Sequence, residues 1–305
     1  MDENQNDILE PEAQPVPQQE TPEAETPDAA PPKKRKVGRI IKRIIYILLL
    51  VIFITVFVCC AIYIAKYMLD SHQATGAYGD LSNLHNQYQG VEDPEHTLPE
   101  GMVPTLPGGD KDPQYILPEL QELYAQNQDL IGWISIPGTN IDYPVVQTPG
   151  NPNYYLRRGF DKQYSTWGCI YAREVCDVFT PSDNVVLYGH HMRDGTMFAQ
   201  LDKYKKKNYW KENQTFTFDT LYERHTYQII AVFKTSANIG KGFSYHTFND
   251  AASEEEFNAF MEEVHRLQFY DTGLTAEYGD MLLTLSTCEY TLDNGRFVVI
   301  AKRIS

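Results

Sequence analysis

The longest apolar stretch of the chain lies near its N-terminus. Residues 44–65 form a run of 22 residues without a charged side chain. At about 1.5 Å per residue, a helix of this length spans roughly 33 Å, which matches a bilayer hydrocarbon core of about 30 Å. The run is too long for the apolar region of a signal peptide, and no cleavage site of small residues follows it. The pattern therefore predicts a single transmembrane helix at 44–65.

Shorter apolar patterns follow from about residue 114. Apolar residues have helical spacing at 115–128, 197–207 and 253–267, and Ser253 is suited to be the N-cap of the last helix. The other patterns are short, rich in β-branched and aromatic residues, and separated by turn residues, which is typical of strands. The predicted strands are 132–137, 141–146, 168–172, 184–189, 215–219, 226–234, 281–287 and 296–302. This order predicts a mainly β fold, either a closed barrel or a sandwich, with an N-terminal helix and inserted helices.

Composition divides the chain into four parts. Residues 1–43 combine an acidic, proline-rich tail with a basic cluster, and we expect disorder in the tail, residues 1–32, because so polar a segment buries too little surface to offset chain entropy. The transmembrane helix at 44–65 comes next. Residues 66–113 are expected to form a stalk, because glycine and proline at this density break helices and strands. Residues 114–305 form the predicted globular domain.

The charge distribution predicts the orientation and limits the partners. Seven lysines and arginines lie at 33–43, and only Lys66 lies just after the apolar run. By the positive-inside rule, the N-terminus is cytoplasmic and the globular domain is extracellular. The string Pro-Lys-Lys-Arg-Lys-Val at 32–37 also has the composition of a nuclear-import signal, but its position beside the apolar run favours the topological role. The net charge of −15 argues against nucleic-acid binding, which needs a basic surface.

One cysteine lies where a nucleophile is expected. Of the five cysteines, Cys59 and Cys60 fall in the apolar run, so at least one of the other three stays unpaired. Cys288 directly follows the predicted strand 281–287, whose second face is small and polar. Arg296 begins the next strand after an Asp-Asn-Gly turn, so a hairpin brings its guanidinium to the same end as the thiol. A guanidinium there favours a thiolate and can donate to an oxyanion.

Cys169 and Cys176 are the alternative nucleophiles. Cys169 lies within the predicted strand 168–172 and has the environment of a small apolar core residue, whereas Cys176 follows in a predicted loop. A disulfide between them stays open on the sequence alone. These contexts favour Cys288 as the nucleophile.

A histidine supplies the third group. The predicted strand 184–189 ends in Gly189-His190, and the glycine permits a turn that presents an imidazole at the strand end. A cysteine nucleophile needs a base or an ion-pair partner, and histidine titrates in the suitable range. His191 points to the opposite face, so the two imidazoles cannot easily share a metal ion. We expect no metal site and no cofactor, since no histidine shows ligand spacing such as His-Glu-x-x-His.

In combination these residues resemble the sortase family. The chain has Thr284-Leu-Ser-Thr-Cys288, then Arg296 before a Val-Val strand, and Tyr188-Gly-His190 earlier, in the order His, Cys, Arg. Each piece alone is weak, because half-buried cysteines, surface arginines and surface histidine pairs are common. The combination is specific.

Further features resemble class B sortases in particular. They are the helix that follows the histidine in 189–198, the inserted helix at 253–267, and the opening helix with Gly132-Trp-Ile after it. His191 is a departure, because many relatives have asparagine at this position. The resemblance covers roughly residues 115–303.

The resemblance implies an eight-stranded sortase-type closed β-barrel and a transpeptidase reaction. The family cysteine attacks the threonyl carbonyl of a C-terminal sorting signal on a secreted protein, and an amine of a peptidoglycan precursor then releases the product. Cys288 would be the nucleophile, His190 its proton partner, and Arg296 the group that steadies the oxyanion or holds the substrate. The resemblance also implies a set of substrate-binding residues, namely Tyr188, Ser286, Thr287, Glu289 and Leu156.

Three other functions stay open on the sequence. A plain thiol peptidase would use water as the acceptor, and a pilin-polymerising sortase would use a lysine. A membrane-tethered β-domain could instead bind carbohydrate or protein without catalysis, which an aromatic content of 12% allows. Loss of Cys288 would leave such a binding module intact, whereas it would abolish an acyl-enzyme.

Overall fold

The computed structural model describes residues 34–90, 116–238 and 240–305. The chain separates into two compact units, Met1–Ile62 and Tyr63–Ser305. The predicted disordered tail at 1–32 and the part of the predicted stalk beyond residue 90 lie outside the described residues.

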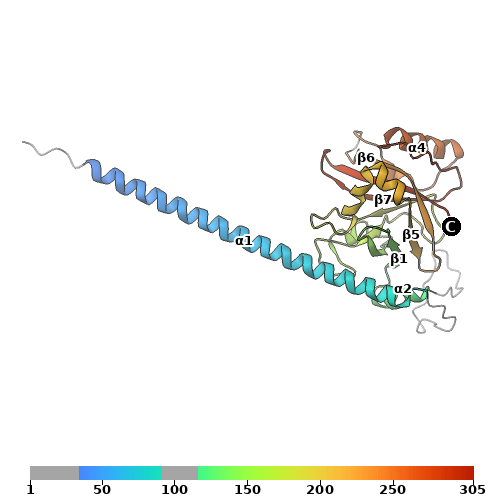
Figure 1. Ribbon diagram of the computed structural model, residues 1–305, viewed down its shortest axis with the longest axis horizontal. Helices are drawn as coiled ribbons and strands as arrows, with labels where there is room; N and C mark the ends of the chain where they lie inside the picture. Colours follow the sequence, from blue (N-terminus) through green and yellow to red (C-terminus); the bar gives the residue numbers. More distant parts are fainter. Residues whose placement is uncertain (1–33, 91–115, 239) are drawn as a thin grey trace, which may run out of the picture. The chain divides into compact units, whose positions relative to one another are not determined.

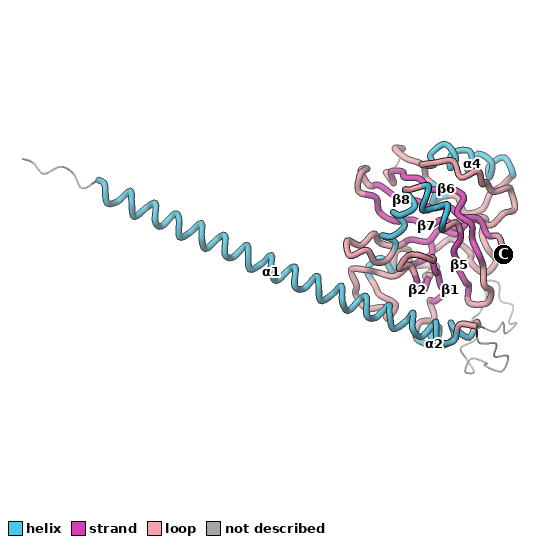
Figure 2. The backbone as a smooth tube through the Cα atoms, in the orientation of Figure 1, coloured by secondary structure: helices cyan, strands magenta, loops and turns pink. Residues whose placement is uncertain are grey.

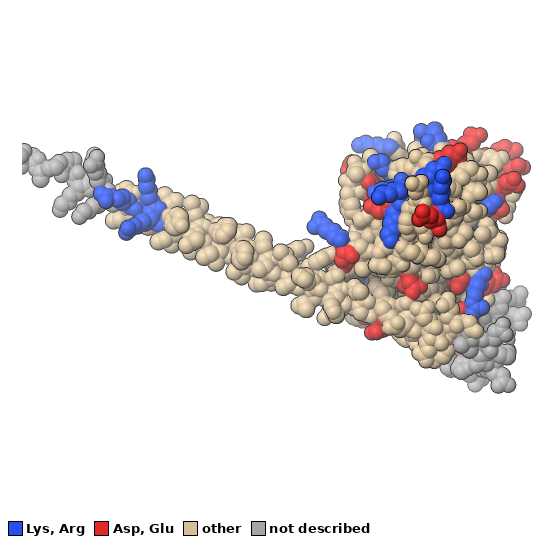
Figure 3. All heavy atoms as spheres, viewed as in Figure 1, with Lys and Arg blue, Asp and Glu red and all other residues tan. Residues whose placement is uncertain are grey.

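The described part of the first unit is the start of helix α1 (Lys34–Tyr88). Within the described residues, α1 is the one helix long and apolar enough to cross a membrane, with a mean hydropathy of 3.2 in its most apolar window. Its large apolar side chains are exposed from Val37 to Ile64, and lysine and arginine side chains gather at its start (Figure 3). Its length and composition are consistent with a membrane anchor.

Helix α1 does not end at the predicted transmembrane boundary. The expectation that glycines such as Gly76 and Gly79 would break the helix is wrong, because α1 continues to Tyr88. A helical glycine costs about 1 kcal/mol relative to alanine, but packing on a neighbouring surface supplies most of a helix's stability. Within the second unit, Tyr78 is buried and donates its hydroxyl to the Gly168 carbonyl.

The second unit is built around a closed barrel of eight strands (Figures 1 and 2). The strands are β1 (Leu130–Ser135), β2 (Asp142–Val146), β3 (Ile170–Ala172), β4 (Asn184–Tyr188), β5 (Thr215–Thr220), β6 (Thr226–Ser236), β7 (Leu282–Glu289) and β8 (Gly295–Arg303). Their order around the barrel is β1-β2-β3-β4-β7-β8-β6-β5. The pairs β2/β3 and β4/β7 are parallel and the other pairs antiparallel. The prediction of eight strands in a closed barrel is confirmed, and the sandwich alternative is not.

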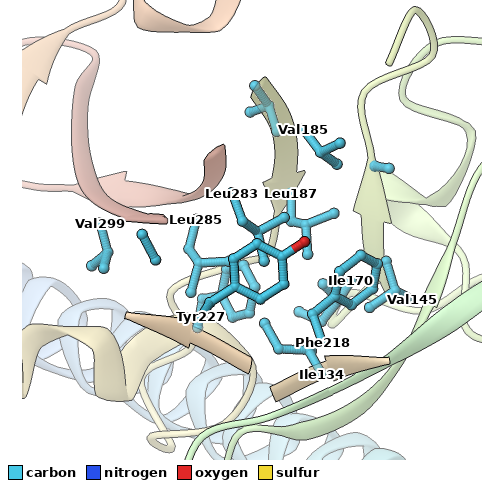
Figure 4. Packing of buried hydrophobic residues seen from close by; sticks show 14 of the residues in the cluster. Ile134, Val145, Ile170, Val185, Leu187, Phe218, Tyr227, Leu283, Leu285 and Val299 are labelled. Atoms are coloured by element: carbon cyan, nitrogen blue, oxygen red, sulfur yellow. The ribbon is translucent and has the colours of Figure 1, made fainter. Parts of the chain in front are cut away.

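Branched and aromatic side chains from all sides of the barrel fill its interior. Ile134, Ile170, Leu187 and Leu285 are fully buried and face one another across it (Figure 4). They come from strands far apart in the chain. Each strand turns one face of its alternating pattern toward the interior, and that face is apolar. A side-chain-filled interior is what eight strands allow.

Helices cover parts of the barrel surface. They are α2 (Pro118–Gln126), α3 (Lys207–Glu212) and α4 (Glu254–Leu267), with short 3₁₀ helices η1 (Tyr154–Arg157), η2 (Phe198–Lys205) and η3 (Tyr245–Thr247). The predicted helix at 197–207 is thus a 3₁₀ helix followed by a short α-helix. The predicted cap is confirmed, since the Ser253 side chain accepts from the Glu256 amide. Helix α4 lies beside β6 (Figure 2) and buries Phe257, Phe260 and Val264.

We predict that Phe257→Ala destabilises the second unit strongly, because the Phe257 side chain is 0% exposed. Removing a buried phenylalanine leaves a cavity and should lower the free energy of unfolding by about 3 kcal/mol. Guanidinium unfolding of the full-length protein in detergent measures this. Asn258→Ala, on the exposed face of the same helix, is the matched control, and an equal effect of both substitutions would contradict the proposed packing of α4.

Candidate active site

A groove of about 310 Å³ opens at the side of the barrel where β4 and β7 end and β8 begins. It holds a thiol, two imidazoles and a guanidinium. Its lining residues are Asn153, Leu156, Tyr171, Tyr188, Gly189, His190, Ala237, Tyr245, His246, Ser286, Thr287, Cys288 and Arg296. A larger hollow of about 780 Å³ lies between α1 and the loop 159–167, and none of these groups lines it.

The β7–β8 hairpin positions the thiol and the guanidinium. Cys288 and Arg296 are direct partners in the antiparallel register, so both lie at one end of the strand pair. The Arg296 guanidinium is held over the turn, since Nη1 donates to the Gly295 carbonyl at 2.9 Å and to Asn294 Oδ1 at 3.1 Å. Asn294 adopts a positive φ of 49°, which the short turn requires. The hairpin therefore brings the two side chains together as the strand pattern predicts.

Parallel pairing of β4 with β7 brings in the histidine. Tyr188 pairs with Ser286, so the residues two positions further on, His190 and Cys288, lie at the same end of the strand pair, and both line the groove. The Gly189 amide continues this ladder by donating to the Ser286 carbonyl at 3.1 Å. Gly189 is required for packing, because a Cβ there would lie 2.5 Å from Ile170 and 2.7 Å from Phe198.

His190 is partly buried and has one fixed hydrogen bond. Its Nε2 lies 2.7 Å from the Leu156 carbonyl oxygen. A carbonyl oxygen can only accept, so Nε2 carries the proton and Nδ1 is the acceptor nitrogen of the neutral ring. Burial lowers the pKa of His190, and the nearby Arg157 guanidinium lowers it further, against the opposing effect of the Leu156 hydrogen bond.

The adjacent His191 has a different environment. Its Nε2 lies 3.2 Å from Asp202 Oδ2, and its ring meets the Tyr290 ring edge-on at 5.3 Å. It does not line the groove. The two imidazoles therefore point to opposite sides, as strand alternation predicts, and His190 is the one that reaches the cysteine's groove.

Four of the five predicted substrate-binding residues line the groove, namely Leu156, Tyr188, Ser286 and Thr287. Glu289 does not, because it points to the other side of the hairpin. Its carboxylate accepts from the Thr291 amide at 2.9 Å and from the Leu292 amide at 3.2 Å. The Thr287 hydroxyl is buried and has no hydrogen-bond partner among the described residues.

Sequence patterns gave no sign of several other groove residues. Tyr245 and His246 come from η3, in the long segment between β6 and α4. The Tyr245 hydroxyl lies 2.6 Å from Ser286 Oγ, and Tyr171 meets Tyr188 with ring centroids 5.4 Å apart. Burial lowers the pKa of His246, as do the Arg173 and Arg296 guanidiniums. No local motif marks these residues, since tertiary packing alone brings them here.

The two alternative cysteines are buried away from the groove. Cys169 and Cys176 are 2% and 4% exposed, and all cysteines among the described residues are free. Burial raises the pKa of Cys169 to about 12, although the Tyr78 hydroxyl lowers it in part. Burial raises the pKa of Cys176 as well. Both are therefore kept as unreactive thiols, whereas Cys288 is part of an open groove.

This barrel and its thiol-bearing groove define a cysteine enzyme that transfers acyl groups. The sortase domain family matches residues 134–304. The chain belongs to the sortase family and is a cysteine transpeptidase.

Within the family the similarity is to sortase B. The chain is 29% identical to sortase B of Staphylococcus aureus (strain NCTC 8325 / PS 47) over 196 residues, which cover 64% of this chain and 78% of that relative. A Staphylococcus aureus sortase B–substrate complex has a TM-score of 0.64 and 25% identity, covering 78% of this chain and 99% of that chain. A sortase B in complex with triglycine has a TM-score of 0.63 and 25% identity, covering 77% and 99%.

We predict that Gly189→Ala disrupts the groove, because the added methyl group would overlap the Ile170 and Phe198 side chains. Overpacking of this kind should lower the free energy of unfolding by about 1–3 kcal/mol. Gly150→Ala is the matched control, since no heavy atom lies within 4 Å of its Cβ position. Denaturant unfolding and the transpeptidation rate of both variants provide the test, and wild-type behaviour of Gly189→Ala would refute the close packing.

Proposed function

We propose that the chain is a membrane-anchored, extracellular class B sortase that attaches secreted proteins to the cell wall. Its substrate is the C-terminal sorting signal of a secreted protein, and its acceptor is an amine of a peptidoglycan precursor. The observation that carries the proposal is the convergence of Cys288, His190 and Arg296 on one groove. The similarity to sortase B supports the class.

In the first half-reaction, Cys288 Sγ attacks the threonyl carbonyl carbon of the sorting signal. A C–S bond forms, and the C–N bond to the following residue breaks. His190 takes the thiol proton as Sγ attacks and gives it to the leaving amine, while the Arg296 guanidinium donates to the oxygen that carries the negative charge. The product is a thioester on Cys288.

In the second half-reaction, the acceptor amine attacks the thioester carbonyl. The new C–N bond forms as the C–S bond breaks, and His190 takes the proton that the amine loses and passes it to the Cys288 sulfur. The enzyme is thereby restored, and no oxidant, metal or nucleotide takes part in the balance. Water in place of the amine would give hydrolysis by the same route.

The groove has walls suited to an extended peptide. Tyr171 and Tyr188 form an aromatic pair in its lining, and Tyr245 and Ser286 line it as well, joined by a hydrogen bond. Aromatic surfaces bury apolar side chains with little loss of conformational entropy, while the hydroxyls orient polar groups.

The membrane topology follows from the charges around the apolar run. The basic residues at 33–43 precede it and only Lys66 directly follows it. The N-terminus is then cytoplasmic and the barrel extracellular. An extracellular barrel meets secreted proteins and wall precursors at the same membrane surface.

We predict that the full-length protein forms a thioester adduct with a sorting peptide and releases it as an amide when triglycine is added. Mass spectrometry should place the adduct on Cys288, and Cys288→Ala should form neither adduct nor product. Cys176→Ala is the control and should retain both. Product formation by Cys288→Ala would refute the proposal. Hydrolysis of the adduct without amide formation would refute transpeptidation.

We predict a second effect at the guanidinium. Arg296→Lys should lower kcat/KM about 100-fold, because an ammonium cannot reproduce the planar donor geometry held by the hairpin. Arg303→Lys, on the same strand and outside the groove, should stay near wild type. Initial rates with a sorting peptide and triglycine measure both, and equal rates would show that charge alone is needed at Arg296.

A further inference from the structure

The loop that begins at His190 is closed at its base. The Phe198 amide donates to the His190 carbonyl at 2.9 Å, and His191 bridges Met197. The Met197 amide donates to the Tyr143 hydroxyl at 3.1 Å. Because these contacts close the loop 190–198 at its base, its base and its tip move together. Contacts that fix the tip therefore also fix the backbone of His190.

The tip is held by Asp194, whose two oxygens accept four hydrogen bonds. Oδ1 accepts from the Thr196 amide at 3.1 Å and from the Thr196 hydroxyl at 2.6 Å. Oδ2 accepts from Ser71 Oγ at 2.7 Å and from Trp167 Nε1 at 2.9 Å. Burial opposes ionisation, but these hydrogen bonds prevail and lower the pKa of Asp194, so the carboxylate is charged at neutral pH.

Ser71 lies far from this loop in the sequence and belongs to α1. Tyr67, one turn earlier on α1, meets the Trp167 ring with centroids 5.6 Å apart. The part of α1 that belongs to the second unit therefore contacts both residues of the Asp194–Trp167 pair. Loss of these contacts would free the tip of the loop.

The same part of α1 also supports the hydrogen-bond partner of His190. Tyr78 donates its hydroxyl to the Gly168 carbonyl. Gly168 packs against η1 so closely that a Cβ would lie 2.8 Å from the Leu156 carbonyl oxygen. That oxygen is the one to which His190 Nε2 donates. Both the backbone of the imidazole and its acceptor thus rest on α1.

We infer that Asp194 is a positioning residue for His190, and that Ser71 of α1 is the partner through which it acts. The segment of α1 from Tyr63 to Tyr88 then helps to position the catalytic histidine, in addition to connecting the barrel to the apolar part of the helix. This inference rests on the proposed function, because it assigns a role toward the His190 proton transfer.

The test uses full-length protein in nanodiscs and four variants: Ser71→Ala, Asp194→Ala, Ser71→Thr and Thr75→Ala. Thr75 is exposed one turn after Ser71 on the same helix and lines a hollow beside Thr196 and Met197. Thr75→Ala therefore removes a hydroxyl near the loop without removing any hydrogen bond of Asp194. Two quantities are measured. One is kcat per alkylation-titrated Cys288 with a sorting peptide and triglycine, and the other is the His190 pKa by NMR of labelled histidine.

Ser71→Ala and Asp194→Ala should lower kcat on the order of 10-fold with KM within about two-fold, because a displaced imidazole loses alignment more than binding. The His190 pKa should rise toward its ordinary value as water reaches a loosened loop, since burial is the main cause of its depression. Ser71→Thr keeps the hydroxyl and should behave as wild type, as should Thr75→Ala.

The inference is overturned if either quantity in Ser71→Ala or Asp194→Ala matches the Thr75→Ala control. Because kcat is expressed per titrated Cys288 thiol, it does not fall when less of the enzyme is folded. A variant that only lowers the amount of folded enzyme therefore also counts against the inference. Wild-type protein that forms no amide would refute the proposed function separately. The His190 pKa then decides the positioning role on its own.

Discussion

The parallel pairing of β4 with β7 is the constraint on which the site depends. Parallel strands end at the same edge, so a histidine just beyond one strand and a cysteine at the end of the other emerge together. The β7–β8 hairpin adds the guanidinium through antiparallel pairing, in which Cys288 and Arg296 lie directly opposite each other. One pairing of each kind therefore brings together three groups that are distant along the chain, and the packing around Gly189 leaves little freedom to shift the register.

The barrel and the three central residues could be predicted from the sequence because their signals are local or combine simply. Strand patterns indicated the number of strands, and strand ends indicated Cys288, Arg296 and His190, which the structure places along one groove. Alternation also predicted that His190 and His191 face different sides, and of these two only His190 lines the groove. The choice between barrel and sandwich needed more, since closure depends on pairings between distant strands that no short window encodes.

Other features could not be predicted, for physical reasons. Glycines in α1 predicted a break, yet buried contacts such as Tyr78 stabilise the helix there. Glu289 adjoins the cysteine but turns away, because neighbouring side chains on a strand face opposite sides and the hairpin amides provide hydrogen bonds. Tyr245 and His246 reach the groove from a segment without a regular pattern, so only tertiary packing reveals them.

The closed barrel has a consequence for how peptides are selected. Every strand has a neighbour on both sides over part of its length, so an incoming peptide finds no full-length open edge to join as a ninth strand. Backbone ladders, which accept almost any sequence, are thus restricted to short strand ends as a source of affinity. Discrimination must come from side chains around the groove, and exchanging a few of them should retarget the enzyme while the scaffold stays intact.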